Sequence, residues 1–135
     1  MIDAYYWRYV ELMSEHNSMH VIIFRNYGER AGATLAHPHS QLVVTPIVPR
    51  ILRLQDQLSQ EYFDTWGRNL LMDIVQQELA DRRRIVAQND SFVAFVPYAA
   101  EVPFEMWIVP HSQQSDFGSV SDHETSIPLS GSLGR

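Results

Sequence analysis

Two histidines and a glutamine stand at alternating positions in the segment His37-Pro38-His39-Ser40-Gln41. In an extended backbone, alternate side chains project to one face about 6.5–7 Å apart, so all three could address one phosphate or one metal ion. A neutral imidazole is a good nucleophile toward phosphorus near neutral pH, because its ordinary pKa is about 6.5. One ring nitrogen must be free while the other donates its proton to an orienting acceptor, and a backbone carbonyl can serve.

A polar loop with two glycines, residues 26–33, runs into these histidines. The glycines would let backbone N–H groups approach a phosphate closely. Gln41 could donate a hydrogen bond to a phosphate oxygen in the transition state. A His-x-His pair is equally compatible with half of a metal site or with two surface histidines. The residue types favour a phosphate-handling site with a histidine nucleophile, and the spacing alone leaves these alternatives open.

The first half of the chain predicts one helix and two strands around this segment. Apolar residues at three- and four-residue spacing predict an amphipathic helix over residues 3–15. A β-branched, apolar run predicts a buried strand at residues 20–24. Residues 41–47 predict a second strand, which Pro46 ends or confines to a sheet edge.

The second half predicts helices followed by short strands. The apolar spacing within residues 48–80 is helical, with a break at Gly67, and the arginine run after Asp81 is typical of a solvated helix end. Strands are predicted at residues 85–88, 92–97 and 104–109. Asn89-Asp90 predicts a turn between the first two of them. Strands, a helical pair and strands again indicate an α+β domain with a largely antiparallel sheet.

Composition narrows the class of protein. The 135 residues are one domain's worth of chain or a piece of a larger one. The net charge of −6 argues against nucleic-acid binding, which usually requires a basic surface. The apolar runs are too short to span a bilayer, and the first residues lack the pattern of a secretory signal. With no cysteine, the chain has no disulfide framework. We therefore expect a cytoplasmic protein with no membrane or nucleic-acid partner.

One pattern resembles a known signature. Phe24-x-Asn26-x-Gly28-x-x-Ala31-Gly32-Ala33-Thr34-x-x-His37-Pro38-His39-Ser40-Gln41 is similar to the active-site motif of the galactose-1-phosphate uridylyltransferase family, which belongs to the histidine-triad-like (HIT-like) superfamily. A second block at residues 96–105, Val-Pro-Tyr followed by Pro-Phe-Glu, is similar to a later segment of that family. Glu105, at the end of this block, is either a site residue or a surface carboxylate. The resemblance implies a HIT-like fold, a mostly antiparallel sheet with packed helices.

The resemblance also divides the chain. Residues 1–48 match the end of the first HIT-like half with the active-site motif, 49–84 a helical connection, and 85–124 the start of the second half. Residues 125–135 are rich in Ser, Gly and Pro, and we expect them to be disordered. On this reading the chain is an incomplete domain pair, an internal fragment of a longer enzyme. Alone it should turn over little or no substrate, because the missing segments cannot position it.

The resemblance implies an activity in galactose metabolism, the ping-pong transfer of UMP from UDP-glucose to galactose 1-phosphate. His39 matches the nucleophile, which would carry UMP as a uridylyl-histidine intermediate. The His37 carbonyl would orient its imidazole, and Gln41 matches the residue that binds the transferred phosphoryl group. Three further positions match residues around the nucleotide phosphates: Asn26, Gly32 and Thr34.

Departures from the family pattern leave a cofactor and other functions open. The His37 ring matches a structural zinc ligand of some family members. The other zinc ligands of those members lie upstream of the position that corresponds to Met1. Zinc is therefore a candidate cofactor of the full-length protein only. A carboxylate that binds a second metal in some members is replaced by Gln55. The alternatives are an ADP-glucose or dinucleoside-polyphosphate phosphorylase of the same superfamily, or a non-catalytic nucleotide-binding remnant. A homodimer could complete the site, because an incomplete sheet leaves exposed edges.

Overall fold

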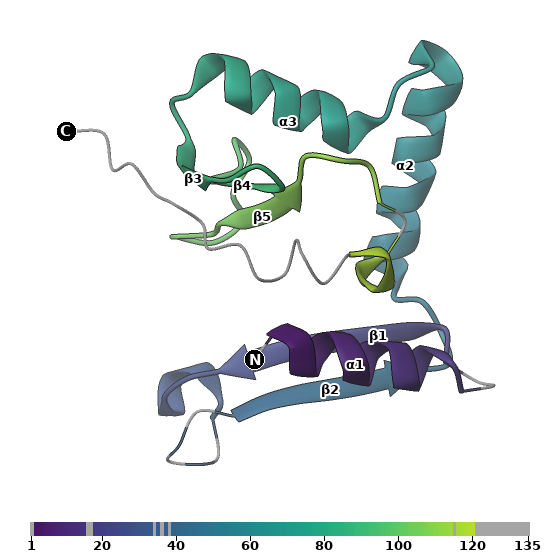
Figure 1. Cartoon of the computed structure of the whole chain (residues 1–135), viewed down its shortest axis with the longest axis vertical. Helices are drawn as coiled ribbons and strands as arrows, with labels where there is room; N and C mark the ends of the chain where they lie inside the picture. Colours follow the sequence, from purple (N-terminus) through teal and green to yellow (C-terminus); the bar gives the residue numbers. More distant parts are fainter. Residues whose placement is uncertain are drawn as a thin grey trace. The chain divides into compact units, whose positions relative to one another are not determined.

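The computed structural model describes residues 2–15, 18–33, 35, 37, 39–114 and 116–120. The chain forms two compact units, Met1–Arg53 and Leu54–Arg135. In the described part, helices accompany two sheets whose strand pairs are all antiparallel, so the predicted α+β class is confirmed (Figure 1). The tail expected to be disordered lies outside the described residues. None of the helices described is both long and apolar enough to cross a membrane.

The first unit is a helix on a two-stranded sheet. Its elements are α1 (Ile2–Met13), β1 (His20–Asn26), the short 3₁₀ helix η1 (Glu29–Ala31) and β2 (His39–Thr45). The predicted helix and both strands are thus confirmed. The strands pair without interruption from His20 opposite Thr45 to Asn26 opposite His39. In Figure 1, α1 lies across this sheet.

The expectation of a buried strand at residues 20–24 is only partly right. Val21 is buried, with 8% of its surface exposed, but the neighbouring Ile22 is 37% exposed. Successive strand residues point to opposite faces, and α1 packs on one face only. A strand in such a sheet alternates between covered and open positions, as antiparallel sheets commonly do.

The second unit begins within α2 (Arg50–Trp66), which is followed by α3 (Leu70–Asp81). The predicted break at Gly67 is confirmed: this residue adopts a φ of 65°, a left-handed conformation that glycine reaches without steric cost. Asn69 then caps α3, since its side-chain oxygen accepts a hydrogen bond from the Met72 N–H at 3.0 Å. The two helices are separate because the chain changes direction after Gly67 and α3 begins with a capped turn at Asn69 (Figure 1).

The helix α3 covers a three-stranded sheet of β3 (Ile85–Gln88), β4 (Phe92–Phe95) and β5 (Trp107–Pro110) (Figure 1). The buried core of this unit combines one helical and three strand residues: Val75, Val93, Phe95 and Val109. The predicted turn between β3 and β4 is confirmed, because the Asn89 side-chain oxygen accepts hydrogen bonds from the N–H groups of Ser91 and Phe92.

The arginine run after α3 is only partly a solvated helix end. Arg82 and Arg83 are exposed, and Arg82 ends the helix at a φ of 57°. Arg84 instead turns back: its Nε donates to both carboxylate oxygens of Glu78 at 3.1 and 2.9 Å, and Glu78 is only 4% exposed. This hydrogen bond raises the pKa of Arg84 above its usual range. The pair joins the end of α3 to the start of β3.

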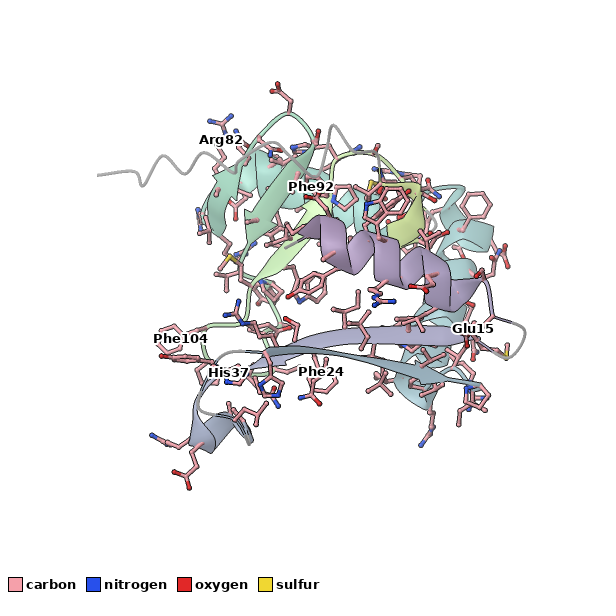
Figure 2. All side chains as sticks on the ribbon, turned by 60° about the horizontal axis from the view of Figure 1, so that its bottom comes forward. Glu15, Phe24, His37, Arg82, Phe92 and Phe104 are labelled. Atoms are coloured by element: carbon pink, nitrogen blue, oxygen red, sulfur yellow. The ribbon has the colours of Figure 1, made fainter. Side chains whose placement is uncertain are left out.

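Two predicted strands are too long. The strand expected at residues 92–97 ends at Phe95, and the one expected at 104–109 starts at Trp107. Phe104 cannot extend β5 because its φ is 66°, outside the extended region. Its side chain is fully exposed, and Figure 2 shows the ring pointing out from the ribbon.

We predict that Phe95→Ala lowers the free energy of unfolding of the second unit by about 3–5 kcal/mol, because it removes a fully buried aromatic side chain and leaves a cavity. Phe63→Ala is the matched control: Phe63 is largely exposed on α2, so its loss should change stability by about 0.5 kcal/mol or less. Urea unfolding followed by circular dichroism measures both. Equal effects of the two substitutions would contradict the position assigned to this core.

Candidate active site

The strands β1 and β2 gather three of the six predicted site residues on one face of their sheet. His39 lies directly opposite Asn26, and Gln41 lies opposite Phe24. In an antiparallel pair, opposed residues share a face, and the next residues on that face are two positions away. Asn26, His39 and Gln41 are therefore neighbours. Ser40 points to the other face, where its hydroxyl is hydrogen-bonded to the hydroxyl of Tyr5 on α1, and Figure 2 shows Phe24 on the side away from α1.

The imidazole of His39 contacts the backbone of the segment before it. Its Nδ1 lies 3.3 Å from the carbonyl oxygen of His37. In the tautomer with the proton on Nδ1, that nitrogen donates to the carbonyl and Nε2 keeps its lone pair. The ring is partly exposed. This arrangement is the one that a histidine nucleophile requires, and it joins two residues of the predicted motif.

His37 itself does not lie in the strand. β2 begins at His39, so the expectation that three side chains share one extended face is wrong for His37 and right for the other two. The exposed His37 ring lies with its centroid 6.2 Å from that of His39, at an interplanar angle of 63°. Its contribution to the site geometry comes from its backbone carbonyl, because the chain has not yet joined the ladder at that position.

The glycine loop folds back toward Asn26. Gly28 and Gly32 adopt φ values of 81° and 78°, which side chains rarely tolerate. A Cβ added at Gly32 would lie 3.8 Å from Nδ2 of Asn26, so this glycine approaches the amide side chain that stands opposite His39. Asn26, Gly32, His39 and Gln41 thus lie in one region of the first unit.

Three of the loop's N–H groups do not face outward as the sequence predicted. The N–H groups of Ala31 and Ala33 donate to the Gly28 carbonyl at 3.1 and 3.2 Å, and that of Gly32 donates to Glu29 at 2.9 Å. These three donors are used inside the loop, so its glycines serve the turn conformation and the approach to Asn26. Thr34, the remaining predicted phosphate-binding residue, lies outside the described residues.

The described residues do not form a metal site by themselves. Among them, no group of three or more His, Asp or Glu side chains is placed to hold a metal ion, and the chain has no cysteine. His37 could therefore supply one ligand, while zinc normally takes three or four from the protein. The donors present do not fit a zinc site, and no chemical step of the site is assigned to a metal.

Glu105 in the second motif block ties its loop together. Its Oε1 accepts a hydrogen bond from the Trp107 indole N–H at 2.8 Å, and its Oε2 accepts one from the Glu101 backbone N–H at 2.6 Å. The Trp107 bond, more than the Glu101 bond, holds the pKa of Glu105 below its usual range. Both carboxylate oxygens are engaged within residues 101–107. The predicted alternatives for Glu105 are a site residue and a surface carboxylate; its hydrogen bonds instead indicate a structural role within its own loop.

Two features of the site were not predicted from the sequence. Phe24 shares the face of Gln41, and its position two residues before Asn26 was a signal for this, because alternate strand residues share a face. The link between Tyr5 and Ser40 had no sequence signal, since the two residues are 35 positions apart. Only the packing of α1 on the sheet brings them together.

The chain matches the family model described as galactose-1-phosphate uridyl transferase, C-terminal domain, over residues 55–129. This match covers more than half of the 135 residues. The chain therefore belongs to the galactose-1-phosphate uridyl transferase family, as its motifs predicted. The assignment of residues 1–48, 49–84 and 85–124 to particular parts of the family's two halves stays a prediction.

Relatives with assigned activities are similar along most of the chain. ADP-glucose phosphorylase from Arabidopsis thaliana is 30% identical over 118 residues, 87% of this chain and 32% of the relative. Galactose-1-phosphate uridylyltransferase from Haemophilus influenzae is 32% identical over 105 residues, 78% of this chain and 30% of the relative. A solved structure of a uridylyltransferase mutant superposes with a TM-score of 0.84 at 33% identity, covering 91% of this chain and 40% of that one. The chain spans about a third of the length of these curated relatives.

We predict that Gly32→Ala lowers the stability of the first unit by about 1–2 kcal/mol, the cost of a left-handed conformation for a residue with a Cβ. The space beside Asn26 is sufficient for a methyl group, so the cost arises in the backbone. Gly32→Asn should lose less, because asparagine tolerates this conformation better. Amide exchange of β1 and β2 as a function of urea measures both, and an alanine variant as stable as the parent would refute the strain argument.

We predict that acid opens the loop that Glu105 ties. Because the folded-state pKa of Glu105 is lowered, its stabilising contribution is present above the unfolded pKa of about 4.3 and is lost as pH falls through the folded pKa. The NMR signal of the Trp107 indole N–H should shift in that acidic range. Glu105→Gln should remove the transition, whereas Glu101→Gln should retain it, because Glu101 contributes its backbone N–H. A transition that survives in Glu105→Gln would assign it to another group.

Proposed function

We propose that the protein is a nucleotidyltransferase that moves UMP from UDP-glucose to galactose 1-phosphate through a uridylyl-histidine intermediate. The observation that carries the proposal is the His39 imidazole, whose Nδ1 lies 3.3 Å from the His37 carbonyl oxygen. In the tautomer with the proton on Nδ1, this contact leaves the Nε2 lone pair for attack on phosphorus. Membership in the galactose-1-phosphate uridyl transferase family supports it. The activity belongs to the longer polypeptide that the relatives represent, because this chain spans about a third of their length.

In the first step, the Nε2 lone pair of His39 attacks the α-phosphorus of UDP-glucose. A phosphorus–nitrogen bond forms as the bond between the α-phosphorus and the bridging oxygen breaks, and glucose 1-phosphate leaves with the electron pair. The Nδ1 proton stays on the ring, which becomes cationic. A hydrogen bond from a charged donor is about twice as strong as a neutral one, so the His37 carbonyl stabilises the ring more in the intermediate than in the free enzyme.

In the second step, a phosphate oxygen of galactose 1-phosphate attacks the same phosphorus. The phosphorus–nitrogen bond breaks, UDP-galactose is released and His39 regains its lone pair. Because Gln41 lies two residues after His39 on the same face of β2, its amide is suited to donate to a non-bridging oxygen in both transition states. Asn26, directly opposite His39, can donate to the same phosphate from the neighbouring strand.

A second function is favoured by one observation. ADP-glucose phosphorylase from Arabidopsis thaliana is similar over 87% of this chain. An adenylyl-histidine at His39 would require the same imidazole geometry, so the described residues do not choose between the two nucleotides. Gln41 and Asn26 would contact the phosphate in either reaction. The choice depends on residues that contact the base.

Other features of the protein stay predictions from its sequence. Zinc at His37 would require ligands from outside the described residues, and the ion is proposed only for the longer protein. A homodimer is proposed as one way to complete the sheet of the first unit, whose two strands pair only with each other among the described residues. A cytoplasmic location and the non-catalytic nucleotide-binding alternative likewise stay predictions.

We predict that the protein acquires radioactive label from UDP-glucose labelled at the α-phosphate, and that His39→Ala abolishes this labelling. The label should be acid-labile and base-stable, as a phosphorus–nitrogen bond to imidazole requires. His20→Ala is the matched control, because His20 lies on the same face of β1 at the opposite end of the ladder, where it pairs with Thr45. That variant should label as the parent does.

The same experiment separates the alternatives. Stronger labelling from ADP-glucose labelled at the α-phosphate would favour the adenylyl transfer. Binding of UDP-glucose by calorimetry without any covalent label would favour the non-catalytic alternative. If the longer polypeptide also fails to label from either donor, the proposed function is wrong. Because turnover by this chain alone should be low, a single-turnover measurement on both polypeptides is the appropriate format.

A further inference from the structure

The strand that carries His39 is tied to α1 by one pair of side chains. The hydroxyl of Tyr5 is hydrogen-bonded to the hydroxyl of Ser40, and both residues are partly buried. Ser40 stands between His39 and Gln41 and points to the opposite face. We propose that Tyr5 is a positioning residue, which acts through Ser40 to hold the end of β2 so that His39 and Gln41 face the substrate. The inference rests on the proposed role of His39.

The end of the strand requires such support. His39 is the first residue of β2 and Asn26 is the last of β1, so their pair is the terminal pair of the ladder. Terminal pairs open more readily than central ones. The contact between His39 Nδ1 and the His37 carbonyl is 3.3 Å long, beyond the usual 2.7–3.2 Å of a strong N–H···O bond. Neither interaction alone fixes the imidazole firmly.

The Tyr5 hydroxyl acts at the position where it has most effect. Ser40 follows His39, the β2 residue of the terminal pair, and its side chain points to the α1 face of the sheet. A hydrogen bond to that side chain therefore restrains the terminal pair from the α1 face and leaves the His39 face free. The tyrosine side chain is well suited to this, because its rigid ring has only two rotatable bonds that must be fixed. The ring would remain in Tyr5→Phe, and only the hydroxyl would be lost. That substitution therefore isolates the bond to Ser40 from the packing of α1.

The test is amide hydrogen exchange on the full chain, for the parent and for Tyr5→Phe, Ser40→Ala and Ser40→Thr. A net intramolecular hydrogen bond changes an opening equilibrium by roughly 2- to 12-fold. We expect Tyr5→Phe and Ser40→Ala to accelerate exchange at residues 39–41 and 25–26 by that factor, and residues 43–45 to exchange as in the parent. Ser40→Thr keeps a hydroxyl on a residue that suits a strand and should retain most of the protection.

A second measurement reads the imidazole directly. The ¹⁵N NMR shifts of His39, at one fixed pH above the ordinary imidazole pKa of about 6.5, report which ring nitrogen carries the proton. In the parent we expect the Nδ1–H form to dominate. Tyr5→Phe should shift the population toward the Nε2–H form. The double variant Tyr5→Phe/Ser40→Ala should show no larger shift in the tautomer ratio than either single variant, because both substitutions remove the same hydrogen bond. Tyr98→Phe, which removes an exposed tyrosine hydroxyl from the second unit, should match the parent.

Two results would overturn the proposal. Unchanged exchange and an unchanged tautomer ratio in Tyr5→Phe would show that the hydroxyl does not position His39. Equal acceleration along the whole strand, including residues 43–45, would show that it only stabilises the unit. Neither readout requires catalysis, so a parent protein that never labels from a nucleotide sugar would refute the proposed function while the exchange data still decide the role of Tyr5.

Discussion

The antiparallel register of β1 and β2 is the constraint on which the candidate site depends. It places Asn26 opposite His39 and Phe24 opposite Gln41. A shift by one residue would turn the imidazole toward α1, since neighbouring strand residues point to opposite faces. The strand residues on the face under α1, such as Val21, resist that shift because it would expose them. Burial on one face of this small sheet thereby fixes the chemistry available on the other.

The elements around the two-stranded sheet contact different residues of the candidate site or next to it. The glycine loop returns to Asn26 through Gly32, and the N–H groups of Ala31, Gly32 and Ala33 are used in its own hydrogen bonds. The His37 carbonyl meets the imidazole from the preceding segment, and Tyr5 reaches Ser40 from α1. The side chains that the register places near His39 are the amides of Asn26 and Gln41, and the described backbone contact of its ring is the His37 carbonyl. Among the described loop residues, these three N–H groups are used within the loop, so the side chains of Asn26 and Gln41 are the directed donors nearest to His39 in the register of the sheet.

The second unit is organised by a different set of interactions. Its core lies between α3 and the three-stranded sheet, with Phe95 at the centre. Carboxylates fix its connections: Glu78 holds Arg84 at the end of α3, and Glu105 closes the loop before β5. The second motif block thus contains a residue whose geometry is that of loop structure, although its sequence pattern resembles part of an enzyme family.

The sequence by itself determined the helices, the strand positions, the breaks at Gly67 and Pro46 and the family, because periodicity, turn residues and motif offsets are local properties. It also identified His39 and Gln41 as residues of one face. Tertiary structure alone decided that His37 contributes its carbonyl, that β5 starts after Phe104 and that Tyr5 reaches Ser40. The physical reason is that register, backbone conformation at a single residue and contacts across 35 positions arise from packing, which no local pattern encodes.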